Sequence, residues 1–84
     1  MGQHKLKRTL EKIFSHPIPS DIEVKEVEHL LEHNGFSLEH SKKNHLKIKK
    51  EDKELVLIAH SHALDNKEEV VKLRHFLEEF GIKP

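Results

Sequence analysis

The sequence predicts one small α+β domain, with its elements in the order helix, helix, strand, strand, strand, helix. In three stretches apolar residues recur every three to four positions, which is the spacing of a helix that buries one face. Between the second and third stretches, apolar and polar residues alternate as they do in strands. The 84 residues suffice for a single domain with a modest core.

The first two helices are bounded by clear stop and start signals. The first is expected at Lys5–Phe14, and HPIPS at residues 16–20 ends it, because proline lacks an N–H and disfavours helical geometry in the residue before it. The second begins after Ser20, which stands three residues before Glu23 in capping-box spacing. Gly35 follows at a position suited to a left-handed helix end. The apolar stripe of this second helix consists of Val24, Val27, Leu30 and Leu31.

Three strands are expected between these helices and the last one. Residues 36–38 and 45–49 alternate between apolar and polar side chains. The run Leu55–Ala59 is continuously apolar, which predicts a central strand buried on both sides. The polar residues 49–54 predict the hairpin connection between the second and third strands.

The last helix is expected to start at Asp65 as N-cap, with Glu68 three residues later. It ends at Gly81, and its buried stripe consists of Val70, Leu73, Phe76, Leu77 and Phe80. Without the leading helix the order is α-β-β-β-α. This is the layout of a double-stranded-RNA-binding-like domain, in which both helices cover one face of a three-stranded antiparallel sheet and leave the other face open.

The second strand decides what the open face carries. Because side chains alternate along a strand, Leu46 and Ile48 point to the helices, and His45, Lys47 and Lys49 point together to the open face. Residues 42–50 hold five lysines and no acid, although the 15 basic and 15 acidic residues of the chain cancel. The sequence therefore predicts a basic strip with an imidazole at one end.

The composition limits the chemistry and the location of the protein. Cysteine is absent, so disulfides, thiolate metal sites and cysteine nucleophiles are excluded, and a cytoplasmic location is expected. No apolar run approaches the length of a membrane span, so no membrane partner is expected. Residues 21–39 hold six acids and one lysine. This separation of charge allows two surfaces with different partners, although a solvated acidic helix face explains it equally well.

Nine histidines are candidates for chemistry. His29 and His33 are four residues apart on one helix face, and His60 and His62 alternate at the end of the third strand. Both spacings suit a metal ion. We nevertheless expect neither a metal nor a cofactor. His45 is the best candidate, since an imidazole exchanges protons near neutral pH and lysines beside it would hold RNA phosphates. RNA supplies its own nucleophile, the 2′-hydroxyl. A solvated histidine on a lysine-rich strand remains the plain alternative.

Four stretches of the chain together resemble the HicA family of toxin–antitoxin toxins. They are IPSDIEVKEVEHLLEHNGFSL, NHLKIK, ELVLIAH and EEVVKLRHFLEEFGI, and with the segment before them they span about residues 9–82. The resemblance is to the longer members, which carry an extra N-terminal helix. It implies a single domain over residues 1–84, with a helical extension at 1–16 and an α-β-β-β-α core at 20–82. It also implies an endoribonuclease, an mRNA interferase, that acts on mRNA and is neutralised by a HicB-like antitoxin.

The family motifs match in part. The Gly-Ser-His pattern at the start of the second strand reads Lys43-Asn44-His45 here, and the later Pro-His-Pro pattern reads Ala59-His60-Ser61. Val24 stands where the resemblance leads us to expect Trp, which implies altered packing. The resemblance thus implies His45 as catalytic acid and base. The residues expected to contact RNA are Lys42, Lys43, Lys47, Lys49, His60, Lys72 and Arg74.

Two other functions compete with this interpretation. The first is a catalytically inactive module of the same fold that binds RNA or an antitoxin, because Lys43 replaces a glycine that would let the backbone approach a phosphate. The second is a histidine-based metal-binding domain. The sequence leaves the RNA preference, the identity of an antitoxin and the oligomeric state open.

Overall fold

The protein is described by a computed structural model that covers residues 2–19, 21–42, 44–59, 62–64 and 66–84. Its elements, in chain order, are α1 (Gly2–Ile13), α2 (Val24–His33), β1 (Ser37–Lys42), β2 (His45–Lys50), β3 (Lys53–Ile58) and α3 (Lys67–Glu79). The predicted α+β class and element order are confirmed, with three helices and one three-stranded antiparallel sheet in the described part of the chain.

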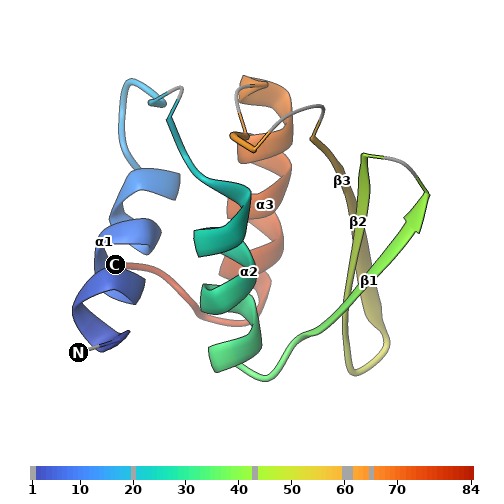
Figure 1. The fold of residues 1–84 in the computed structure, drawn as a ribbon. Coiled ribbons are helices and arrows are strands. Elements are labelled where there is room, and N and C mark those ends of the chain that lie inside the picture. The colour runs from blue at the N-terminus through green and yellow to red at the C-terminus, as the bar shows by residue number, and fades with distance from the viewer. Residues whose placement is uncertain (1, 20, 43, 60–61, 65) are drawn as a thin grey trace.

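The elements form three layers (Figure 1). Helices α2 and α3 lie side by side on one face of the sheet, and α1 packs against these two helices on the side away from the strands. No described helix covers the other face of the sheet. The segment that follows α3 runs back towards α1, so the two chain ends lie near the same outer layer (Figure 1).

The sheet order is β1-β2-β3, so β2 is the central strand. Leu38 pairs with Ile48 across one hairpin, and Ile48 pairs with Leu55 across the other. The prediction that Leu55–Ala59 forms a central strand buried on both sides is therefore wrong: β3 lies at an edge. Its apolar run reflects one face packed on the helices, with Leu57 buried, and a second face that leaves Ile58 exposed.

The alternation of β2 is confirmed. Leu46 and Ile48 are buried beneath the helices, whereas His45 and Lys47 are half-buried and Lys49 is exposed. Ile48 has no exposed surface, and burial of an aliphatic side chain of this size contributes about 1.5–3 kcal/mol. The buried apolar core consists of Ile13, Ile22, Val27, Leu30, Leu31, Phe36, Leu46, Ile48, Leu57, Leu64, Val70, Leu73, Phe76 and Leu77.

The C-terminal ends of α2 and α3 were predicted correctly. Gly35 and Gly81 have φ values of 84° and 73°, in the left-handed region that glycine adopts without steric cost. After α3, the N–H of Gly81 donates to the Glu78 carbonyl and the N–H of Ile82 donates to the Leu77 carbonyl. This Schellman pattern satisfies carbonyls that a helix end otherwise leaves without partners.

The helix starts differ from the predicted ones. Helix α2 begins at Val24 with Glu23 as N-cap, later than the expected start after Ser20, which lies outside the described residues. The cause is a long-range pairing: the N–H of Val24 donates to the His62 carbonyl, and the N–H of Leu64 donates to the Ile22 carbonyl. An extended segment paired in this way cannot be helical, so the helix starts where the pairing ends.

At α3 the N-cap is Asn66, one residue after the predicted Asp65, which lies outside the described residues. The Asn66 side chain accepts a hydrogen bond from the Glu68 N–H at 2.9 Å, as expected for a short polar side chain at this position. The capping principle behind the prediction therefore holds, displaced by one residue.

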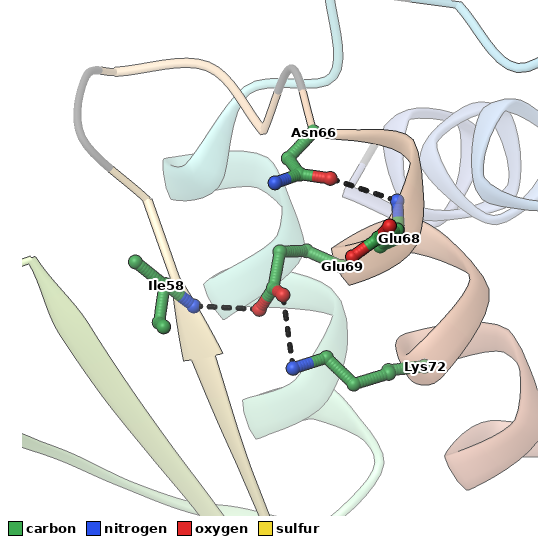
Figure 2. A network of polar contacts seen from close by, with 5 residues as sticks. All are labelled: Ile58, Asn66, Glu68, Glu69 and Lys72. Carbon is green, nitrogen blue, oxygen red and sulfur yellow. Dashed lines mark hydrogen bonds and ion pairs between the residues drawn. The ribbon is translucent and has the colours of Figure 1, made fainter.

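Helix α3 holds the edge strand β3 at both ends. The buried carboxylate of Glu69 accepts a hydrogen bond from the Ile58 N–H at 2.8 Å and lies 2.9 Å from Lys72 Nζ (Figure 2). At the start of β3, Lys53 donates to Glu79 at 2.6 Å, and this hydrogen bond raises the pKa of Lys53 from its ordinary 10.5. An edge N–H that already has a partner is less open to pairing with another chain.

The two faces of β3 give a direct test of the fold. Leu57→Ala is expected to lower the free energy of unfolding by about 2–5 kcal/mol, because Leu57 is 1% exposed and its removal leaves a cavity. The neighbouring Ile58→Ala, at 37% exposure, is expected to cost less than about 1 kcal/mol. Urea unfolding of both variants measures this, and equal losses would contradict the assignment of the two faces.

Candidate functional site

His45 is the first residue of the central strand, at the end of the sheet near the start of α2. The preceding Asn44 has a φ of 68°, so a left-handed residue turns the chain into β2, and its carbonyl accepts a hydrogen bond from the Ala59 N–H at 2.9 Å. Across the sheet His45 pairs with Ile58 on one side and with Lys42 on the other. These contacts fix the backbone of His45, while its half-buried side chain remains accessible.

The lysines that follow His45 on the open face are not free cations. Lys47 Nζ lies 3.5 Å and Lys49 Nζ lies 3.9 Å from the carboxylate oxygens of Glu54, which extends from β3. Glu39 of β1 pairs with Lys47 in the register of the sheet. The basic strip therefore contains matching acids from both neighbouring strands. Ion pairs of this exposed kind contribute about 0.2–1 kcal/mol, so a phosphate can displace them.

Lys50 contacts residues of the helix layer and does not belong to the open face of the sheet. Its Nζ donates to the Asn34 carbonyl at 2.8 Å and lies 4.9 Å from the centroid of the Phe36 ring and 5.3 Å from that of Phe80. A cation bound to the C-terminal end of α2 complements the negative end of the helix dipole. Lys50 thus has a structural role.

A hollow of about 90 Å³ opens beside His45. It is lined by Val24, His40, Asn44, His45, Leu46 and Ala59. A wider groove of about 520 Å³ adjoins it at Val24 and is lined by Glu23, Val24, Lys25, Glu28 and His62. A third, apolar space of about 10 Å³ also has Val24 in its wall. Val24 thus borders all three of these spaces.

His40 is the residue of this site that the sequence pattern did not reveal. Its Nε2 lies 3.1 Å from Glu28 Oε2, so the imidazole of β1 is hydrogen-bonded to a carboxylate of α2. The strand pairing shifts register between Glu39 and Lys42 just where His40 lies. Alternation from Leu38, which packs against the core, places His40 on the helix face of β1, where Glu28 lies. Another available signal was the position of His40 and His45 on either side of a short turn.

The remaining predicted RNA contacts are scattered. Lys43 and His60 lie outside the described residues, and Lys42 pairs with His45 through the strand backbone. Lys72 is held at the edge of β3 by Glu69. Arg74 faces the helix layer, where its Nε donates to the Ile13 carbonyl at 2.6 Å and its guanidinium also donates to the Ser15 carbonyl. A phosphate would have to compete with both of these hydrogen bonds.

Of the two histidine pairs with metal-like spacing, only His29 and His33 lie wholly within the described residues. In the part of the chain that the structure describes, no three histidines, aspartates or glutamates are arranged to hold a metal ion. His29 and His33 are exposed on α2, and His62 lines the wide groove while its expected companion His60 lies outside the described residues. Across the described residues no helix combines the length and apolar character that a bilayer crossing requires.

Comparisons with protein-family models, with curated proteins and with solved structures find no significant match for this chain. The family resemblance of its motifs therefore stays a prediction.

The contacts of Arg74 predict a stabilising role that can be measured. Arg74→Ala removes two hydrogen bonds to the carbonyls at the end of α1, so the free energy of unfolding is expected to fall by about 1.5–3 kcal/mol. Lys67→Ala, in the exposed first turn of the same helix, serves as control and is expected to stay within about 0.5 kcal/mol of the wild type. Indistinguishable thermal and urea unfolding of the two variants would refute this role.

Proposed function

We propose that the protein is a HicA-like ribonuclease that cleaves mRNA, with His45 transferring the proton. The observation that carries the proposal is the placement of His45: it begins the central strand, its side chain is accessible, and it lines a hollow at the end of the sheet, beside the start of α2. An imidazole there can exchange a proton with a bound RNA backbone. The double-stranded-RNA-binding-like arrangement is part of the same proposal, supported by two helices on one face of an open sheet.

RNA cleavage at His45 requires few other groups. The RNA 2′-hydroxyl attacks the adjacent phosphorus, so the protein has to move protons and stabilise phosphate charge. Lys47 and Lys49 are the described cations on the same strand face as His45, and the phosphate would replace Glu54 as their partner. Lys42, Lys43 and His60 belong to the proposal through the motifs alone. Arg74 is left out of it, because its guanidinium is bound to carbonyls near α1.

A module of the same fold that binds RNA without cutting it is the second candidate. The observation that favours it is the shared partner of the two lysines, since Glu54 offsets part of the positive charge that a cleaving site would direct at a phosphate. Lys43 replaces the glycine of the family motif, and this also favours binding without cleavage, because a side chain there hinders close approach of a phosphate.

A HicB-like antitoxin is the expected protein partner. By analogy with the family, it would cover the open sheet face or the edge of β3 near Lys72. Recovery of an unrelated protein with the tagged chain, with no antitoxin encoded beside it, would count against this partner.

Cleavage of a structured mRNA transcript by the purified protein tests the function. The wild type is expected to cut it, and His45→Ala to cut about 10²–10⁴-fold more slowly, the usual contribution of one general acid or base. His75→Ala, an exposed histidine on α3, is the matched control and is expected to cut at the wild-type rate. The same His45 substitution is expected to relieve growth inhibition on expression.

The two candidates separate in this assay. A wild type that retains the transcript in a filter-binding measurement but leaves it intact supports the binding module and contradicts the nuclease. Cleavage that persists at the full rate in a correctly folded His45→Ala variant would remove His45 from the chemistry.

A further inference from the structure

Two imidazoles, and not one, face the hollow at the end of the sheet. His40 comes from β1 and His45 from β2, and both line the same space of about 90 Å³. A hollow of this size, open to solvent, can accommodate a phosphate group. Cleavage of RNA by its own 2′-hydroxyl needs one group that takes a proton and one that gives a proton, and an imidazole can serve as either.

The two imidazoles differ in their partners. His40 Nε2 lies 3.1 Å from the Glu28 carboxylate, whose side chain is 23% exposed, whereas the His40 side chain is 68% exposed. A carboxylate that accepts the N–H of one imidazole nitrogen fixes the ring and leaves the other nitrogen to accept a proton. Beyond Glu28, the charged or titratable groups in the adjoining groove are Glu23, Lys25 and His62.

We propose that His40, held by Glu28, is the general base of the site and that His45 is its general acid. This inference rests on the proposed ribonuclease function and adds a second proton-transfer residue to it. His40 takes the proton of the 2′-hydroxyl as that oxygen bonds to phosphorus. The bond from phosphorus to the 5′-oxygen breaks, and this oxygen receives the proton of His45. The products are a 2′,3′-cyclic phosphate and a free 5′-hydroxyl, and no metal or cofactor takes part in the step.

Three variants separate the roles by rate. His40→Ala and His45→Ala are each expected to lower kcat by about 10²–10⁴-fold on an oligoribonucleotide that spans the cut site mapped on the transcript. Glu28→Gln keeps a hydrogen-bonding side chain but loses the charge, so kcat is expected to fall at least tenfold with KM unchanged, as for a positioning residue. His75→Ala is the control, and thermal melting followed by circular dichroism checks that each variant is folded.

A sulfur-substituted substrate distinguishes the base from the acid. When sulfur replaces the bridging 5′-oxygen, the leaving thiolate needs no proton, because thiols have pKa values near 8.5. On this oligonucleotide His45→Ala is expected to recover to within about tenfold of the wild type, whereas His40→Ala stays at least about 10²-fold slower.

The outcomes keep the two proposals apart. A folded His40→Ala variant that cuts the ordinary RNA at the wild-type rate, while His45→Ala does not, overturns the role of His40 and leaves the ribonuclease in place. Recovery of His40→Ala on the sulfur substrate overturns its assignment as the base. A wild type that cuts no RNA overturns both proposals together.

Discussion

The structure depends most on the central position of β2, whose two faces have opposite environments. Leu46 and Ile48 are buried beneath α2 and α3, and a shift of one residue in the strand register would send both into water. Because that register is strongly favoured, Lys47 and Lys49 are held on the opposite face, where both contact Glu54, and His45 is held at the start of the strand. The site is thus positioned by hydrophobic packing on the far side of one strand, and its polar groups are available for chemistry.

Long-range polar contacts place the other walls of the site. Pairing of residues 22–24 with residues 62–64 delays the start of α2 to Val24 and brings Glu28 within reach of His40. Arg74 joins α3 to the end of α1, and Glu69 joins it to the edge of β3. Each of these contacts joins residues that are far apart in the sequence or on different elements. Together they hold the three layers in one arrangement.

Short sequence patterns predicted the features that interactions between neighbouring residues determine. Helical spacing, strand alternation and the glycines at positions 35 and 81 gave the element order, the buried side of β2 and the ends of two helices. They failed at features that contacts between distant residues determine. The run Leu55–Ala59 carries no signal for an edge position, and the start of α2 is set by a distant segment. His40 was not singled out because its partner Glu28 lies on another element, and the hollow beside it forms only when α2 packs on the sheet.

The central claim is that the His40 and His45 rings face one hollow outside the core. A nuclear Overhauser spectrum of the protein with labelled histidine rings and methyl groups measures this directly. The account predicts contacts from both rings to methyl groups that line the hollow, those of Val24 and Ala59. Contacts from the His45 ring to the methyl groups of Leu30 or Leu31, deep in the core, would contradict it.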